Sequence, residues 1–356
     1  MIRNMKMVSN ILFGRGSFSQ LGHVLTHRRA ASSMRIVFLI DEVFRGGSMA
    51  EKLPLDDGDI TLWVNTDNEP TTDGIDEICR KIEALSGEIP VGVTGIGGGS
   101  VLDTAKAVSV MLTNPGRAAD YQGWDLPSEP GVYHVGVPTL AGTGAEVSRT
   151  AVLTGPVRKL GINSDHTVFD QIILDPDLLD GAPEDQRFYT GMDCYIHCVE
   201  SLRGNFLNEV SRSLAQKARE LCGQVFMSPP SNDSGEKLMA ASMWGGMSIT
   251  YSQVGICHAL SYGLSYVLKL RHGLANCVVF DCLGEFYPDE VDEFRRMCDA
   301  NHIELPGKLT AGATEEQMEE MVTVALSMEP LWENALGPGW REAMTGNRVM
   351  DLLRRI

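Results

Sequence analysis

The sequence predicts an α/β fold, with an N-terminal domain built on a largely parallel, Rossmann-like sheet and a C-terminal all-helical domain. Two observations support this prediction. Up to about residue 180, short β-rich runs alternate with helical patterns, which is typical of a parallel sheet covered by helices. After that point helical spacing continues, while clusters of β-branched residues disappear. We therefore expect two domains, residues 1–180 and 181–356, joined near residues 180–183.

Length and charge limit the possible classes of protein. The 356 residues are 43% hydrophobic, which is enough for two packed domains, and the net charge of −17 argues against a nucleic-acid or anionic-membrane partner. The chain begins with only a short apolar run at residues 11–13, and no stretch reaches the roughly 18 apolar residues of a membrane span. The eight cysteines form no Cys-x-x-Cys pair, so we expect reduced, buried thiols and a cytoplasmic protein.

The strands of the N-terminal domain are predicted from apolar runs rich in β-branched residues. These runs lie at residues 35–41, 60–64, 90–96, 132–138 and 171–176, with an amphipathic helical segment at 76–85. Ligands of such sheets bind at the carboxyl ends of the strands. Asp41, at the end of the first run, is therefore a candidate acceptor for an adenosine ribose that favours NAD over NADP, although a strand-terminal Asp also serves as a helix cap.

Two loops of small residues also follow predicted strands. Glycines 97–99 open a helix whose apolar face begins at Val101, so backbone N–H groups and the positive helix end can meet a pyrophosphate there. This run is not a Gly-x-Gly-x-x-Gly fingerprint, and such a turn can be purely structural. The second loop, residues 138–146, offers the hydroxyls of Thr139 and Thr143 to a cofactor, and a tight turn with capping threonines is an equally good interpretation.

The helices of the C-terminal domain are predicted from apolar spacing at residues 183–204, 208–226, 235–251 and 258–270, with further helices beyond. Thr314 and Gln317 form a capping-box pattern that predicts the start of one of these later helices.

One aspartate and three histidines are the candidate metal ligands. Asp193 and His197 are four positions apart, so a helix places them on one face of an otherwise apolar segment, where an unpaired carboxylate would be costly. His258 and His272 also flank apolar helical stretches. A hydrogen-bonded core role is commoner for any single histidine, and spacing alone does not show that the four converge. Together the four side chains suit iron(II) or zinc.

Four runs carry a family resemblance. They are Gly-Gly-Gly-Ser-x-x-Asp-x-Ala-Lys at 97–106, Pro-Thr-x-Ala-Gly-Thr-Gly-x-Glu at 138–146, Gly-x-Asp-x-x-x-His at 191–197 and His-Gly-Leu-Ala-Asn at 272–276. By their order and separation the chain resembles the iron-containing (group III) alcohol dehydrogenase family over nearly its whole length. The resemblance implies a dinucleotide-binding domain, a helical domain and one metal on Asp193, His197, His258 and His272. It also implies that Gly98, Gly99, Ser100, Thr139, Thr143 and Lys159 contact the cofactor. We add Asp103, in the first of the four runs, to these candidate cofactor-binding residues.

The chain departs from the family pattern at three positions. Tyr262 stands where many members have a histidine four residues after the third ligand, so we take Tyr262 as the candidate catalytic residue, with an altered proton relay. Leu140 replaces the second threonine of the cofactor loop. Glu69 replaces the usual asparagine before a Pro-Thr pair, and we expect an acid there to weaken the binding of the dinucleotide or to change its position.

The expected function is metal-dependent oxidation of a primary alcohol to an aldehyde. Within the family the chain most resembles a bacterial branch that oxidises the C8 hydroxyl of 3-deoxy-D-manno-octulosonate on the route to an 8-amino sugar of lipopolysaccharide. Arg203, Lys269 and Arg271 are candidate partners for the carboxylate of such a substrate, or merely helix-end charges.

Three other functions stay open: an NAD-dependent dehydrogenase of a small alcohol or polyol, a dehydroquinate-synthase-like lyase with metal and NAD, and a non-catalytic metal-binding protein. The acceptor is NAD or dioxygen. A homodimer is the expected assembly.

Overall fold

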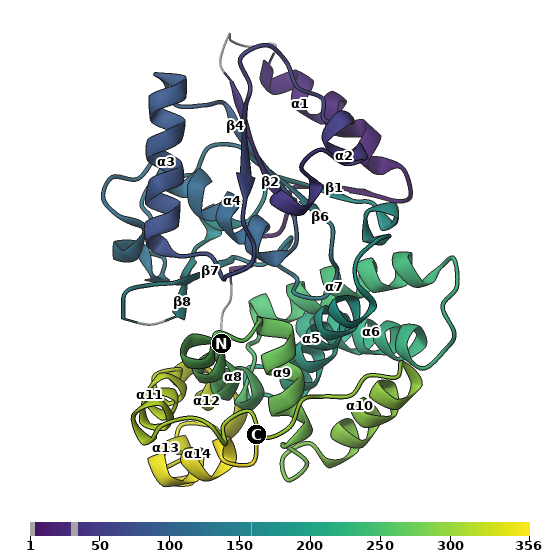
Figure 1. Cartoon of the computed structure of the whole chain (residues 1–356), viewed down its shortest axis with the longest axis vertical. Helices are drawn as coiled ribbons and strands as arrows, with labels where there is room; N and C mark the ends of the chain where they lie inside the picture. Colours follow the sequence, from purple (N-terminus) through teal and green to yellow (C-terminus); the bar gives the residue numbers. More distant parts are fainter. Residues whose placement is uncertain (1–3, 30–34, 158) are drawn as a thin grey trace. The chain divides into compact units, whose positions relative to one another are not determined.

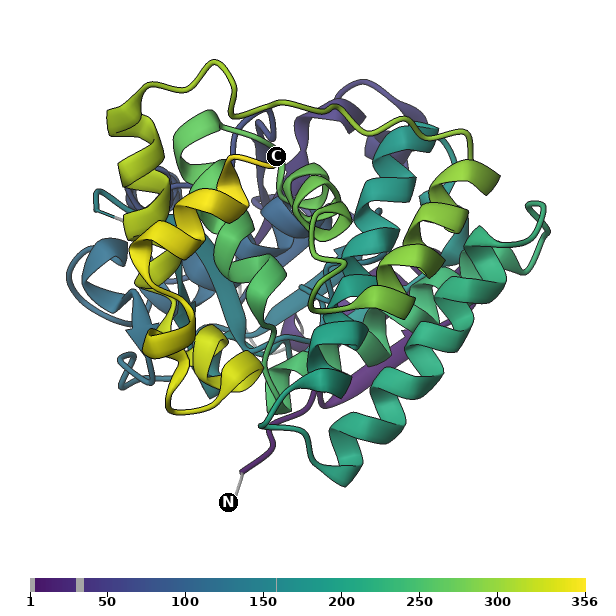
Figure 2. The same ribbon diagram turned by 90° about the horizontal axis from the view of Figure 1, so that it is seen from below.

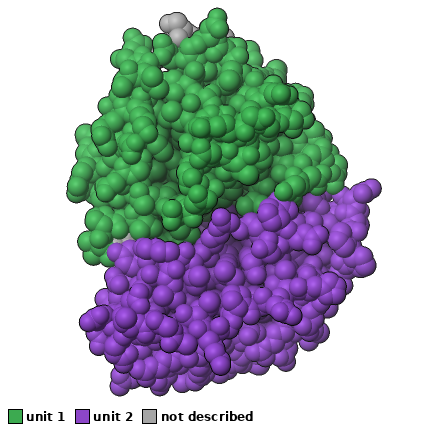
Figure 3. All heavy atoms as spheres, in the orientation of Figure 1, with its two compact units in different colours: residues 1–140, 145–181 green, residues 141–144, 182–356 purple. Residues whose placement is uncertain are grey.

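The computed structural model of the chain describes residues 4–29, 35–157 and 159–356, which form two compact units. The first unit holds residues 1–140 and 145–181, and the second holds 141–144 and 182–356 (Figure 3). The short segment 141–144 belongs with the helical unit because it packs on that unit's helices. Gly142 N–H donates to Ser242 Oγ at 2.8 Å, and a Cβ on Gly142 would lie only 1.7 Å from the Thr190 carbonyl oxygen.

A six-stranded parallel sheet forms the centre of the first unit (Figure 1). The strands lie in the order β1-β9-β6-β4-β2-β3. Its strands are β1 (Asn10–Phe13), β2 (Ile36–Asp41), β3 (Ile60–Val64), β4 (Gly92–Gly97), β6 (His134–Pro138) and β9 (Gln171–Leu174). The predicted parallel sheet is thus confirmed, with an additional short edge strand, β1. β9 ends before the predicted residue 176 because Asp175 accepts a hydrogen bond from Asp177 N–H and caps the short helix η5 (Pro176–Leu179).

Helices cover both faces of this sheet. On one face Leu21 and Leu25 of α1 (Leu21–Arg29) belong to a buried cluster with Phe38 and Ile40 of β2. On the other face α4 (Gly99–Met111) packs so closely on β4 that a Cβ on Gly95 would lie 2.6 Å from Ala105 Cβ. The remaining helices of this unit are α2 (Ser48–Glu51), α3 (Thr72–Ser86) and the short η1 (Ser17–Gln20), η2 (Glu42–Phe44), η3 (Ala118–Tyr121) and η4 (Asp165–Thr167).

A second, three-stranded sheet in the first unit was not predicted. It pairs β8 (Lys159–Asn163) with β5 (Gly123–Trp124) in parallel and with β7 (Thr150–Thr154) in antiparallel orientation. β7 and β8 are five residues each and depend on each other for their ladder of hydrogen bonds, so their apolar pattern is too short to stand out in the sequence.

The second unit is helical among the described residues, as predicted, and Figure 2 shows its helices after a turn of 90°. The helices are α5 (Glu184–Arg203), α6 (Glu209–Phe226), α7 (Ser234–Tyr251), α8 (Ile256–Leu268), α9 (His272–Asp281), α10 (Pro288–Ala300), α11 (Glu315–Leu326), α12 (Glu329–Leu336), α13 (Trp340–Ala343) and α14 (Gly346–Leu353). The capping box of Thr314 and Gln317 is confirmed at the start of α11. α8 ends two residues before the predicted position because Lys269 adopts a left-handed conformation, with φ of 57°.

Two predictions from composition can be compared with the structure. Among the described residues, no helix is both long and apolar enough to span a membrane. All eight cysteines are free thiols, and all but Cys282 are buried, as predicted.

Candidate metal centre

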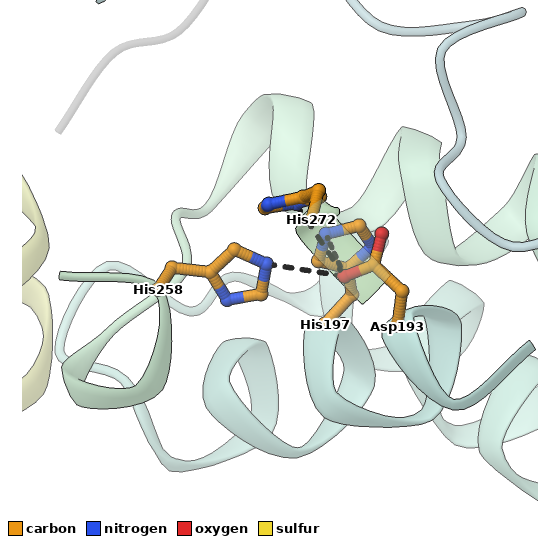
Figure 4. Close-up of side chains that lie close together, drawn as sticks. All are labelled: Asp193, His197, His258 and His272. Carbon is orange, nitrogen blue, oxygen red and sulfur yellow. Dashed lines mark ion pairs between the residues drawn. The ribbon is translucent and has the colours of Figure 1, made fainter. Parts of the chain in front are cut away.

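The four predicted metal ligands meet at one point of the second unit. Asp193 and His197 project from α5, His258 from α8, and His272 is the first residue of α9 (Figure 4). Asp193 Oδ1 lies 3.4, 3.3 and 3.7 Å from the Nε2 atoms of His197, His258 and His272, respectively. Within the described part of the chain, one ligand atom from each of these four residues lies within 4.8 Å of the others. The packing of three helices thus produces the convergence that the spacing of residues could not show.

Burial and charge shape the titration of this group. Asp193 is 0% exposed, and burial alone would raise its pKa, but the surrounding histidines lower the pKa below its usual range. Burial lowers the pKa of His197 to about 4. Burial acts on His258 in the same direction, but the carboxylates of Glu200 and Asp193 prevail and raise its pKa to about 9. The site therefore holds a buried negative charge surrounded by imidazoles.

A divalent cation fits this donor set. Asp193 Oδ2 is buried and has no hydrogen-bond partner among the described residues, so this oxygen has unused capacity for a ligand. One carboxylate and three imidazoles suit iron(II) or zinc. The side chain of His272 is 24% exposed, whereas the side chains of the other three ligands are at most 5% exposed, so solvent reaches the set on the His272 side.

Two residues at this centre had no role in the prediction. Asn276, one turn after His272 on α9, donates from Nδ2 to Asp193 Oδ1 at 2.6 Å and lies 3.1 Å from His258 Nε2. Glu200 lies 2.5 Å from His258 Nδ1. Both could have been found as further polar members of a helix face, because each lies three or four positions from a ligand on its own helix.

The glycine-rich turn forms the start of α4 in the first unit. Gly98 is the N-cap residue, and Gly99 and Ser100 are the first two residues of the helix. A Cβ on Gly97 would lie 2.6 Å from Val101 Cγ2, so only glycine fits at that position. Thr139 adjoins the turn, since its N–H donates to the Gly97 carbonyl oxygen at 3.0 Å. These backbone groups meet at the carboxyl ends of β4 and β6.

Asp41 ends β2 beside the same turn. A Cβ on Gly97 would lie 3.2 Å from Asp41 Cβ. The Asp41 carboxylate accepts hydrogen bonds from the Val43 N–H at 3.1 Å, which caps η2, and from Thr66 Oγ1 at 3.2 Å. The capping role that the sequence left open is therefore present, and a contact with a ribose stays a prediction.

The other predicted cofactor residues differ in their surroundings. The buried Asp103 carboxylate accepts hydrogen bonds from Lys106 Nζ and the Val152 N–H, both at 3.1 Å, and so supports the helix and β7. Lys159 is 1% exposed, with Nζ 3.3 Å from Glu69 Oε1. Thr143 lies in the segment 141–144 that belongs to the second unit. Cofactor contacts of these residues remain predictions.

Tyr262 lies beside the metal ligands. It follows His258 by one turn of α8, and its ring centroid lies 6.3 Å from that of His258 and 5.7 Å from that of His272. Among the candidate cations, Arg203 pairs with Glu290 at 2.7 Å, whereas Lys269 and Arg271 are exposed and lie just before the start of α9.

Two family profiles match most of the chain. The profile described as iron-containing alcohol dehydrogenase matches residues 9–176, and that of the C-terminal part of the Fe-containing alcohol dehydrogenase family matches residues 187–334.

Named relatives agree with these profiles. Sulfoacetaldehyde reductase of Bilophila wadsworthia is 32% identical over 60% of this chain and 56% of its own length. Alcohol dehydrogenase 4 of Schizosaccharomyces pombe is 29% identical over 64% of this chain and 54% of its own, so the match spans little more than half of these relatives. NAD-dependent methanol dehydrogenase of Bacillus methanolicus is 26% identical over 88% of this chain and 83% of its own.

Solved structures share the fold. A 1,3-propanediol oxidoreductase superposes with a TM-score of 0.83 at 21% identity, covering 99% of both chains. The sulfoacetaldehyde reductase of Bifidobacterium kashiwanohense in complex with NAD+ gives a TM-score of 0.80 at 21% identity, covering 99% of this chain and 98% of its own. Together with the profile matches and the metal-ligand motif, these findings show that the chain belongs to the iron-containing alcohol dehydrogenase family.

Proposed function

We propose that this chain is a metal-dependent oxidoreductase that oxidises a primary alcohol to an aldehyde. The main support is the convergence of Asp193, His197, His258 and His272, of which only His272 is partly exposed, within a chain of this family. When bound there, a divalent metal supplies Lewis acidity toward an alcohol hydroxyl group. Iron is the metal that the family description names, and zinc suits the same donors.

The protein's own residues orient the alcohol and handle its proton in this proposal. The alcohol approaches on the side of His272, the most exposed ligand of the set. Tyr262, half-buried beside His272, is the catalytic residue, whose hydroxyl group takes part in transferring the proton of the alcohol.

NAD is the proposed hydride acceptor. Its support is the side-chain-free turn at Gly97–Gly98, where the N-terminus of α4 presents N–H groups to a phosphate. The names of the Bacillus methanolicus relative and of the NAD+ complex point to the same cofactor. We assign its contacts to the predicted residues Asp41, Gly98, Gly99, Ser100, Asp103, Thr139, Thr143 and Lys159.

For the substrate we propose a sugar acid, 3-deoxy-D-manno-octulosonate, which would be oxidised at its C8 hydroxyl group. Its support is the pair of exposed cations, Lys269 and Arg271, next to His272, which suit a carboxylate. Arg203 contributes less, because Glu290 already neutralises it. The second candidate is a small alcohol, which is favoured by the names of the methanol dehydrogenase and sulfoacetaldehyde reductase relatives.

One experiment separates these possibilities. The purified chain is stripped of metal, reconstituted with Fe²⁺ or Zn²⁺ and supplied with 3-deoxy-octulosonate, primary alcohols and polyols, while NADH and peroxide are followed. NADH formation supports the dehydrogenase and peroxide an oxidase. Metal binding without turnover of any alcohol would contradict the proposal and favour a lyase or a non-catalytic protein.

We also propose a homodimer in the cytoplasm. β1 lies at the edge of the sheet with Ile11 39% and Phe13 42% exposed, an apolar edge suited to a second copy. The free, mostly buried thiols suit a reducing compartment. Light scattering coupled to size-exclusion chromatography measures the molar mass in solution, and the mass of a monomer would contradict the proposed homodimer.

A further inference from the structure

Glu200 shares a face of α5 with two metal ligands. It follows Asp193 by seven positions and His197 by three, and these spacings align side chains along a helix. The side chain of Glu200 is 0% exposed. Because a carboxylate removed from water is costly unless polar partners replace the water, the partners of Glu200 indicate its role.

Both carboxylate oxygens of Glu200 contact the start of α8. Oε2 lies 2.5 Å from His258 Nδ1, and Oε1 accepts a hydrogen bond from the Cys257 N–H at 2.6 Å. An ionised carboxylate only accepts, so the proton of this contact is on Nδ1. The other ring nitrogen, Nε2, then faces Asp193 Oδ1 at 3.3 Å and is the atom available to a metal.

The N-terminus of α8 is built to receive this carboxylate. Its N-cap residue is Gly255, which offers no side chain to the first N–H groups of the helix. A Cβ on Gly255 would lie 3.2 Å from Glu200 Oε1, which is tighter than ordinary contact. Glu200 thus serves as the cap from a neighbouring helix, and the positive end of α8 favours its negative charge.

Glu200 and Asp193 place two buried carboxylates on the two nitrogens of one imidazole. Their combined charge is equal and opposite to that of a divalent cation. A balanced set of charges is the arrangement that a protein interior tolerates best.

We propose that Glu200 is a positioning residue of the metal centre. It holds His258 in the tautomer that presents Nε2 to the ion, fixes the start of α8 against α5, and supplies the second negative charge that balances a divalent cation. This inference rests on the metal site of the proposed function and adds a residue that does not itself coordinate the metal.

The test is the zinc affinity of the full chain carrying Glu200→Gln, measured by competition with a chromophoric chelator. Glutamine replaces one of the two carboxylate oxygens by an NH₂ donor, so either the Cys257 N–H or the His258 Nδ1–H loses its acceptor. We expect roughly 10- to 100-fold weaker zinc binding, as is typical for residues that support a ligand. In ¹H–¹⁵N spectra of the zinc-loaded protein, the Nδ1–H signal of His258 should shift or vanish.

Glu293→Gln is the matched control. Glu293 also accepts a hydrogen bond from α5, from Tyr195 Oη at 2.6 Å, and it pairs with Arg219, but none of these residues is a ligand. This variant should lose thermal stability and keep wild-type zinc affinity. Zinc affinity of Glu200→Gln within twofold of wild type, or an equal loss in both variants, would overturn the proposal.

Glu200→Asp provides the second variant. It keeps the charge but shortens the side chain by one CH₂ group, so its zinc affinity should lie between those of wild type and Glu200→Gln. Should Glu200→Gln not fold, wild-type zinc affinity in Glu200→Asp overturns the proposal. A wild-type chain that binds no zinc at the four ligands refutes the proposed function instead.

Discussion

Replacing Asp193 by asparagine removes one negative charge from the middle of the ligand set and changes little else. Asparagine has nearly the same volume, and its carbonyl oxygen can still accept the hydrogen bond that Asn276 Nδ2 donates to Asp193 Oδ1 at 2.6 Å. The side chain is fully buried, so no water takes its place. The variant therefore separates the charge of Asp193 from its packing.

The expected loss of metal affinity is more than about 100-fold. Residues that merely support a ligand account for roughly 10- to 100-fold of metal affinity. Asp193 is itself a candidate ligand and the only carboxylate of the four. Its Oδ1 atom lies 3.3 to 3.7 Å from all three Nε2 atoms, so the change affects the whole set.

Chelator competition gives the dissociation constant for zinc, and elemental analysis gives the bound iron after reconstitution. Asp185→Asn is the matched control, because Asp185 lies exposed in the first turn of the same helix. It should bind metal as wild type does. Wild-type metal affinity in Asp193→Asn would refute the ligand assignment, and so would an equal loss in Asp185→Asn.

Other variants and conditions test the remaining steps. In the presence of a chelator, the metal-free protein should be most stable near pH 6.5, because His258, with its pKa raised from 6.5 to about 9, contributes stability that is lost as pH rises through 9. His197, with its pKa lowered from 6.5 to about 4, contributes stability that is lost as pH falls from 6.5 towards 4. A flat denaturation profile between pH 4 and 9 would contradict this expectation. Tyr262→Phe should lower kcat about 100-fold or more with unchanged metal content if its hydroxyl group transfers a proton, and an unchanged kcat would exclude that role. Gly97→Ala, whose Cβ would lie 2.6 Å from Val101 Cγ2, should cost roughly 1–3 kcal/mol of stability and weaken NADH binding in a fluorescence titration. Gly223→Ala is its control, with nothing within 4 Å of the added Cβ, and an equal effect in both would contradict the assignment.

Features that depend on near neighbours were predictable from the sequence. The apolar run that forms β2 and the capping box that starts α11 appear where they were expected. The predicted segment 183–204 is α5, with Pro183 and Gly204 as its two cap residues. Helix periodicity and caps involve residues at most four positions apart, so these signals are present in any short window of sequence. β7 and β8 had no such signal, because each is stabilised by its partner strand.

The metal centre likewise has one part that near neighbours in the sequence predict and one part that depends on tertiary packing. That Asp193 and His197 share a face follows from 3.6 residues per helical turn, and it could be read without any structure. Their meeting with His258 and His272 could not, because it depends on how α5 packs against α8 and α9, which begin more than fifty residues after α5 ends. The family motifs predicted that these four residues bind one metal, but only the packed helices give the distances around Asp193 Oδ1. The contact of Glu200 with His258, across 58 positions, was decided by that packing alone.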